Sequence, residues 1–308
     1  MRVDPAVETT TEIAAEVTAR GPTPAPARRP RRRFRLGLVG TVGVLLLLVL
    51  SGVGVFAPWI APYDPDATTG DPFEPPSGRH WLGANDVGRD ILSELIYGVR
   101  ISMTIGFLAA TVSISIGTLV GVVAGYFAGW VDAALMRLVD IVLVIPFLPL
   151  MILLAAYLGP SFWNLILVIG ILVWARPARV LRAQVLSMRS LDYVEAARAL
   201  GASSGRIARR HILPGVLSLS LAQFILAASS AILIEASLSF LGLGDPTAKS
   251  WGSTLYYAQV RSAFLTGAWK WWVVPPGLMI TAAVLGFAFT GFALEEILNP
   301  RLRRSGGV

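Results

Sequence analysis

Six long apolar stretches separated by polar segments dominate the chain. A bilayer core about 30 Å thick requires about 20 apolar residues in a helix, and the first stretch, residues 36–56, supplies them. The later stretches occupy residues 101–127, 135–157, 162–174, 216–243 and 271–294. None shows the ten-residue alternation of a membrane barrel. The pattern therefore predicts an all-α integral membrane protein with six transmembrane helices.

Two of these stretches are expected to be irregular. Pro146 and Pro149 lie within 135–157 and can kink that helix. The stretch 162–174 is short, so its helix is expected to extend beyond its ends. Small residues that allow close helix packing recur in the second stretch: Gly106, Gly117, Gly121 and Gly125.

The first 35 residues are rich in proline, alanine and arginine. They cannot bury a core, so we expect a disordered basic arm at 1–35. Arginines ahead of an apolar stretch also describe a signal peptide. No small-residue cleavage site is obvious before Pro58, and the length of the stretch and the later spans favour a retained anchor.

The composition agrees with a membrane protein and argues against a nucleic-acid partner. Hydrophobic residues make up 55% of the 308 and charged residues 15%, with a mean hydropathy of +0.66, which is far more apolar than a soluble domain. The net charge of +7 does not indicate a nucleic-acid partner, because the arginines flank apolar stretches in blocks. The chain has no cysteine, which excludes disulfides and thiolate metal sites.

The distribution of Lys and Arg predicts the orientation, because these residues concentrate in cytoplasmic segments. With both termini in the cytoplasm, 20 of the 26 face inward. The six that face outward are Arg79, Arg89, Arg100, Lys249, Arg261 and Lys270. The segment 58–100 fits the outer side, since it carries seven acids against three arginines.

A strongly basic segment at 176–214 separates two apolar stretches and holds eight arginines against two acids. Its residues 192–200 are helix-forming, and Gly201 is a natural helix stop. Alanines make this helix thin, and its predicted apolar anchors are Tyr193, Val194 and Leu200. A short helix held outside the membrane indicates a docking element.

A second short helix is expected after Gly201. Ser203 or Ser204 can cap it, and it contains Arg206. The two short helices form an elbow, and Pro214 is expected to separate this elbow from the following membrane helix. Such an elbow can transmit force from a docked partner to the membrane.

The spacing within this segment resembles a known motif. Glu195-Ala196-Ala197, then Gly201, then Leu213-Pro214 is similar to the EAA loop in permease subunits of ATP-binding-cassette importers. The family consensus has an isoleucine two positions before the leucine, where this chain has His211. The Glu-Ala-Ala, Gly and Leu-Pro register fits nonetheless.

Further segments resemble the C-type permease of the dipeptide, oligopeptide and nickel branch of this family. Two of them, 56–65 and 80–93, follow the first helix, and others lie in the last third of the chain: 238–244, 251–252, 275–277 and 299–302. The resemblance implies a type I importer permease fold. The segments are then an arm at 1–35, a first helix at 36–57, an extracytoplasmic segment at 58–100, a permease core at 101–304 and a tail at 305–308.

The resemblance also implies partners and a place in the cell. The chain would form half of a translocation pore in the bacterial plasma membrane, with a homologous permease as the other half. Two ATP-binding cassette subunits, separate or fused, would hold ATP and magnesium, and a substrate-binding protein would dock outside. The implied cargo is a di- or oligopeptide, with nickel, glutathione or another small solute as the alternative. The residues that the motif assigns to ATPase coupling are Tyr193, Glu195, Ala196, Ala197, Gly201, Arg206, Leu213 and Pro214.

Glu235 is the only acid deep within a predicted span. Such a charge is costly and should face protein or water. It either lines the pathway and meets the amino group of a peptide, or it is a structural acid bonded to a neighbouring helix, which we favour. Asp140 is expected to pair with Arg137 at the inner interface rather than to relay protons.

No pattern in the chain predicts catalysis. There is no phosphate-binding Gly-x-x-x-x-Gly-Lys loop and no plausible set of Ser, Asp and His. His80 and His211 fall on opposite predicted sides, so no metal site is expected. A competing class is an ion-coupled secondary transporter with Glu235 and Asp140 as ion carriers, but no inverted repeat is visible.

Overall fold

The computed structural model describes residues 37–298, with side chains described to residue 295. Every regular element in that range is a helix, and the only β-type pairs there are isolated bridges between Thr68 and Arg89 and between Ala84 and Asp90. The predicted arm at 1–35 and tail at 305–308 lie outside the described residues.

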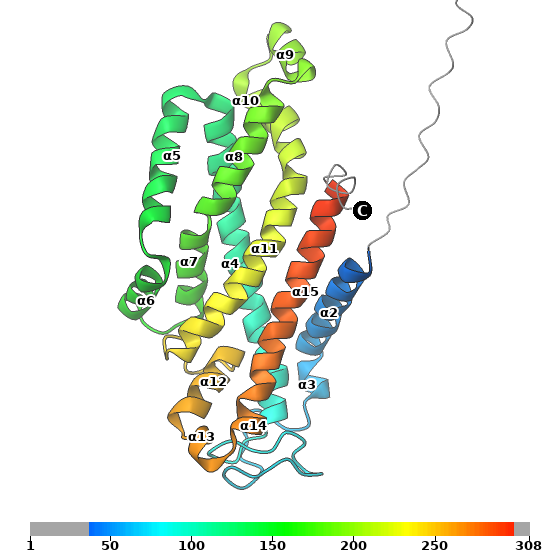
Figure 1. The fold of residues 1–308 in the computed structure, drawn as a ribbon, viewed down its shortest axis with the longest axis vertical. Coiled ribbons are helices and arrows are strands. Elements are labelled where there is room, and N and C mark those ends of the chain that lie inside the picture. The colour runs from blue at the N-terminus through cyan, green and yellow to red at the C-terminus, as the bar shows by residue number, and fades with distance from the viewer. Residues whose placement is uncertain (1–36, 299–308) are drawn as a thin grey trace, which may run out of the picture. The chain divides into compact units, whose positions relative to one another are not determined.

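Four helical runs in the described range are long and apolar enough to cross a membrane. They are α2 (Leu38–Val55), α4 (Ile91–Phe127), the run Ser204–Phe240 that contains α11 (Leu213–Phe240), and the run Trp269–Glu295 that contains most of α15 (Val274–Leu298). Two bent helix pairs raise the number to as many as six if each pair is one span. These helices run side by side (Figure 1), and the predicted all-α membrane fold is confirmed.

The first bent pair consists of α5 (Gly129–Val144) and α6 (Phe147–Leu158), which meet at 87°. The break falls at Ile145, which has an extended backbone because it precedes Pro146. The kink expected at Pro149 is absent. That proline is the third residue of α6, where a helix has no backbone partner for the missing N–H.

The second bent pair consists of α7 (Phe162–Val173) and α8 (Ala175–Arg189), which meet at 41°. The expected extension of the short stretch 162–174 is therefore found at its end. This changes the predicted loop 176–214, whose first part is helix. The buried face of α8 includes Ala178, Leu181, Val185 and Met188, which lie about one turn apart. Through this face α8 packs on the bundle, although its mean hydropathy is low.

The helix containing α11 begins earlier than expected. α10 (Ser204–Ile207), a π-helical turn (Ala208–Ile212) and α11 are continuous, so the prediction that Pro214 separates them is wrong. The π turn ends at Ile212, two residues before Pro214, and the Leu213 N–H bonds to Ala208 O. A widened turn accommodates a proline, which lacks the N–H of a normal helical residue.

The helix α4 is the centre of the bundle and contacts α8, α11 and α7. It approaches α8 through the expected glycines. A Cβ at Gly121 would lie 2.9 Å from Ala178 O, and a Cβ at Gly125 would lie 2.7 Å from Val185 Cβ. Only glycine allows backbones this close, which explains the spacing along α4.

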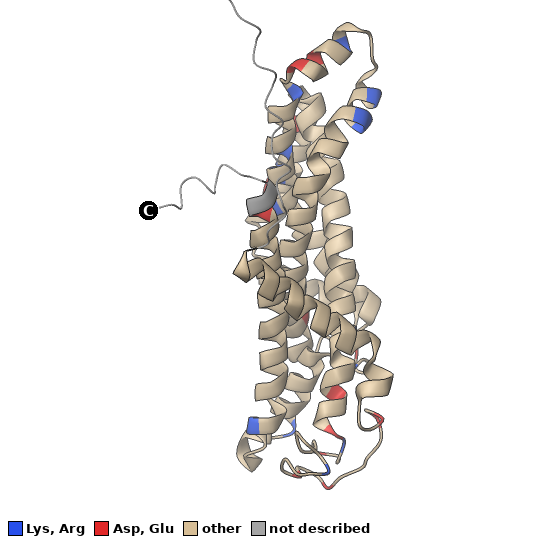
Figure 2. Cartoon of the chain, turned by 90° about the vertical axis from the view of Figure 1, so that its right-hand side faces the viewer, with Lys and Arg blue, Asp and Glu red and all other residues tan. Residues whose placement is uncertain are grey.

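The two ends of the bundle carry different elements. The helices α9 (Asp192–Ala199) and α10 lie at one end, and the other end holds α3 (Ala57–Ile60), the loop segment 61–90, α12 (Trp251–Val260), α13 (Ala263–Thr266) and α14 (Trp269–Trp272) (Figure 1). Most charged residues lie toward these ends (Figure 2). Residues 91–100, assigned to the outer segment from sequence, belong to α4.

Candidate functional site

The helix α9 has the predicted start, end and stop. Gly201 has a φ of +78°, and its N–H bonds to Arg198 O at 3.0 Å. The Ala202 N–H bonds to Ala197 O at 3.1 Å. These two bonds form a Schellman motif, which satisfies the last carbonyls of the helix. A left-handed residue at this position favours glycine, so the chain turns sharply back toward α10.

One face of α9 is fixed to the bundle and the other is free. Val194 is fully buried in a cluster with Ile207 and Ile212. The prediction that Val194 anchors an external partner is therefore wrong, because the side chain holds α9 against its own chain. Tyr193 is exposed, and Leu200 is 88% exposed, so these two apolar side chains remain available for a partner.

The other predicted coupling residues gather at the same end of the bundle. Glu195, Ala196, Arg206 and Pro214 are exposed, and Ala197 and Leu213 are half-buried. The Tyr193 ring lies with its centroid 6.2 Å from that of His211, in the π turn. Ser203 takes the expected N-cap position, but its side chain makes no capping bond; its carbonyl accepts from Arg206 N at 2.9 Å.

Ion pairs join α8 to α5 beside this region. Arg182 forms a two-pronged pair with Asp132, and Arg179 pairs with Asp140. The expected partner of Asp140 was Arg137, one turn away on the same helix. Because α8 continues as a helix, it carries Arg179 to Asp140 and makes a pair between helices instead.

Glu235 is fully buried in α11. Its Oε2 accepts from Ser102 Oγ at 3.1 Å, and its Oε1 accepts from Ser239 Oγ at 2.8 Å. Ser102 Oγ also accepts from Trp251 N at 3.2 Å. Glu235 therefore belongs to a network that joins α4, α11 and α12. This arrangement favours the structural interpretation over a carboxylate that lines a pathway.

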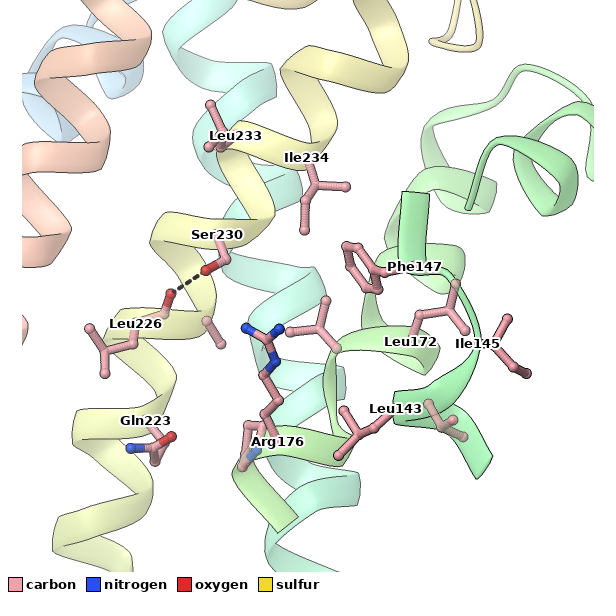
Figure 3. A pocket seen from close by; sticks show the side chains of 14 residues that line it. Leu143, Ile145, Phe147, Leu172, Arg176, Gln223, Leu226, Ser230, Leu233 and Ile234 are labelled. Atoms are coloured by element: carbon pink, nitrogen blue, oxygen red, sulfur yellow. Dashed lines mark hydrogen bonds between the residues drawn. The ribbon is translucent and has the colours of Figure 1, made fainter. Parts of the chain in front are cut away.

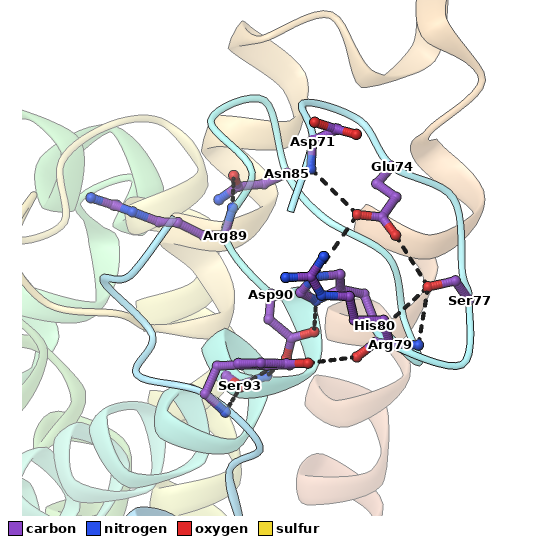
Figure 4. Close-up of polar contacts among 10 residues, drawn as sticks. Asp71, Glu74, Ser77, Arg79, His80, Asn85, Arg89, Asp90 and Ser93 are labelled. Carbon is purple, nitrogen blue, oxygen red and sulfur yellow. Dashed lines mark hydrogen bonds and ion pairs between the residues drawn. The ribbon is translucent and has the colours of Figure 1, made fainter. Parts of the chain in front are cut away.

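The loop segment 61–90 is held together by a buried polar network (Figure 4). His80 is fully buried, and its Nδ1 lies 3.0 Å from Asp90 Oδ1. The other oxygen of Asp90 accepts from Ser93 N at 2.8 Å and so caps the first turn of α4. Ser93 Oγ in turn accepts from Tyr63 N at 3.1 Å. The helix start thus organises the loop around it.

The connection between α11 and α12 is attached to other elements by two charged residues, Asp245 and Lys249. Lys249 Nζ lies 3.2 Å from both Glu94 Oε1 and Asp66 Oδ1. Asp245 Oδ2 accepts from the N–H of Phe162, at the start of α7. Burial alone would raise the pKa of Asp245, but hydrogen bonds from Thr247 and from the Phe162 backbone outweigh it and lower that pKa. None of these contacts was predicted from the sequence; the excess of acids in 58–100 is a local signal for the Lys249 pairs only.

Comparison with known proteins supports the resemblance found in the motifs. Residues 117–304 match the family described as the binding-protein-dependent transport system inner membrane component. Residues 26–76 match the N-terminal transmembrane domain of oligopeptide transport permease C.

Three curated relatives cover nearly the whole chain. A putative peptide transport system permease protein of Brucella suis is 39% identical over 93% of this chain and 95% of its own length. A dipeptide transport system permease protein of Alkalihalophilus pseudofirmus is 34% identical over 91% of both chains. A glutathione transport system permease protein of Pectobacterium atrosepticum is 35% identical over 90% of this chain and 92% of its own length. Together with its membrane-spanning helices, these matches establish that the chain belongs to the family of binding-protein-dependent transport system inner membrane components.

Proposed function

We propose that this chain is a permease subunit of an ATP-driven importer of di- or oligopeptides. It forms half of the translocation pore, with a homologous permease as the other half. The names of the relatives from Brucella suis and Alkalihalophilus pseudofirmus support the peptide cargo. ATP and magnesium bind to two cassette subunits, separate or fused, and a substrate-binding protein delivers the peptide from outside.

The observation that carries this proposal is the attachment of α9 to the end of a long membrane helix. Val194 packs with Ile207 and Ile212, and both isoleucines belong to the helical run that continues to Phe240. A displacement of α9 is therefore expected to move the helical run that passes through the bundle. Close-packed side chains transmit strain between the elements that they join.

The exposed face of α9 is suited to a groove on the cassette subunit. Tyr193 and Leu200 supply apolar contact area, and Glu195 adds one charge beside them. An amphipathic helix that inserts its apolar residues into a groove is a recurring recognition mode. In this proposal α9 faces the cytoplasm and the loop segment 61–90 faces outward, as the distribution of Lys and Arg favours.

Two leucines allow a matched test of the coupling surface. Leu200 and Leu265 are both 88% exposed, but Leu265 belongs to α13 at the opposite end. We expect Leu200→Asp to abolish copurification of the cassette subunit, whereas Leu265→Asp retains it. Equal recovery of the cassette subunit with both variants would refute α9 as its docking element.

A second cargo class follows from the relative in Pectobacterium atrosepticum, whose name assigns it to glutathione transport. Glutathione is itself a tripeptide, so the same pathway could carry it. Competition distinguishes the two cargoes in vesicles that contain the complete importer. Uptake of labelled trialanine that is unaffected by excess glutathione supports the peptide assignment, and uptake of glutathione alone supports the alternative.

A further inference from the structure

A cavity of about 460 Å³ opens where the two bent helix pairs meet α11. Its wall comes from the break between α5 and α6, the bend between α7 and α8, and the middle of α11 (Figure 3). Eleven of the fourteen lining residues are apolar, and the exceptions are Arg176, Gln223 and Ser230. Interrupted helices in membrane proteins commonly line substrate pathways.

Arg176 differs from its neighbours on α8. Arg179 and Arg182, one and two turns further on, pair with Asp140 and Asp132. In Figure 3 the Arg176 guanidinium lies in the space between α11 and the bent helices, and no hydrogen bond joins it to another lining residue. Arg176 is an exposed residue and Gln223 is half-buried, so the guanidinium faces the open space of the cavity, where water or an anion must meet its charge.

Gln223 lies across the cavity on α11 and adds a second polar group. Its amide is a hydrogen-bond donor, and arginine presents several donors in a planar fork that matches a carboxylate. Ser230 Oγ already donates to Leu226 O. The two remaining donors and the apolar wall suit a ligand with one carboxylate and apolar side chains.

We propose that Arg176 and Gln223 form a transient binding site for the terminal carboxylate of a peptide in passage. This inference rests on the peptide cargo proposed above. The cavity volume lies in the range typical of small-ligand sites, which favours a peptide as the occupant. An acidic side chain of a second subunit would need only a contact surface and no cavity of this size. A lipid headgroup is an alternative occupant that the test below distinguishes.

The absence of native cysteines permits a direct test in the assembled importer. Ser230→Cys places a single thiol in the cavity wall, with the partner subunits also made cysteine-free. The complex is placed in nanodiscs of phosphatidylcholine with or without phosphatidylglycerol, and the rate of maleimide labelling is measured with increasing trialanine or trialanine amide. Binding near Arg176 should slow labelling, and the free acid should half-protect at a concentration about tenfold lower than the amide.

Two arginine variants identify the group responsible. Arg176→Gln should remove the difference between acid and amide and lower trialanine uptake about tenfold. Arg179→Gln removes a charge one turn away, outside the lining, and should keep the difference.

Several results would overturn the inference. They are equal protection by acid and amide, a difference that persists in Arg176→Gln, and protection that requires phosphatidylglycerol rather than peptide. If wild-type complex takes up no peptide, the proposed cargo is wrong and this inference fails with it. If uptake is normal and Arg176→Gln has no effect, only the carboxylate site is refuted.

Discussion

Lys249 Nζ lies 3.2 Å from Glu94 Oε1, although the two residues are 155 positions apart in the chain. The Glu94 carboxylate is almost completely buried and also accepts from Asn85 Nδ2 at 3.2 Å. The same ammonium group reaches Asp66, in the loop segment 61–90. One lysine therefore connects this loop, the first turn of α4 and the connection between α11 and α12.

Replacing that lysine should destabilise the loop end of the bundle. In Lys249→Met the buried Glu94 carboxylate keeps only a neutral partner, which should lower the free energy of unfolding by about 2 kcal/mol. Thermal unfolding in detergent measures the change. Lys270→Met is the control, because Lys270 is exposed and belongs to the same end. Adding Glu94→Gln to Lys249→Met should recover much of the loss; a double variant no more stable than the single one argues against the pair.

The turn after α9 gives a second prediction. A β-branched residue at Gly201 would have to adopt a φ of +78°, which costs about 1–2 kcal/mol. This backbone strain is the only expected effect of the new side chain, because no neighbouring atom lies within 4 Å of its Cβ. Gly201→Val should therefore misplace α9 and lower ATP-coupled uptake, while membrane insertion persists. The measurement is uptake per inserted complex.

A second glycine provides the control for this variant. Gly205 also has free space around its Cβ, but its φ is not left-handed. Gly205→Val should keep most uptake. Unchanged uptake in Gly201→Val would show that the shape of this turn does not matter for coupling.

Glu235 gives a third prediction, in which two substitutions differ. Glu235→Gln can still accept from one serine and donate to the other, so assembly and most transport should be retained. Glu235→Leu leaves the hydroxyls of Ser102 and Ser239 without their acceptor and should lower stability by about 1–3 kcal/mol. Thermal unfolding and uptake are measured together. A stable Glu235→Gln complex that responds to its binding protein yet imports nothing would assign the carboxylate to the pathway.

The predictable parts of this structure depend on local chemistry. Four of the six apolar stretches correspond to the long helices α2, α4, α11 and α15, because hydropathy over about 20 residues is sufficient to define a span, whereas the other two correspond to bent helix pairs. The end of α9 was predictable as well, because a helix-forming segment followed by Gly201 specifies its own stop. These features need no knowledge of distant residues.

The unpredicted parts depend on distant contacts. The helix α8 looks like a basic loop in sequence, yet Asp132 and Asp140 on α5 neutralise two of its arginines and its apolar face packs on α4. Val194 looked like a free anchor because nothing local reveals Ile207 and Ile212 beside it. The cavity beside Arg176 likewise forms only when the two bent helix pairs and α11 are assembled.

The orientation in the membrane gives the last prediction. Gly78 lies in the loop segment 61–90 with free space around its Cβ, and Ser203 is exposed beside α10 at the other end. Gly78 has no side chain, and the Ser203 side chain takes no part in the networks described above, so Gly78→Cys and Ser203→Cys should fold normally in this cysteine-free chain. Because Lys and Arg favour the cytoplasmic side, an impermeant maleimide applied to intact cells should label Gly78→Cys and spare Ser203→Cys. Permeabilised cells should label both, which checks accessibility. The opposite result in intact cells would invert the topology and place α9 beyond the reach of a cytoplasmic ATPase.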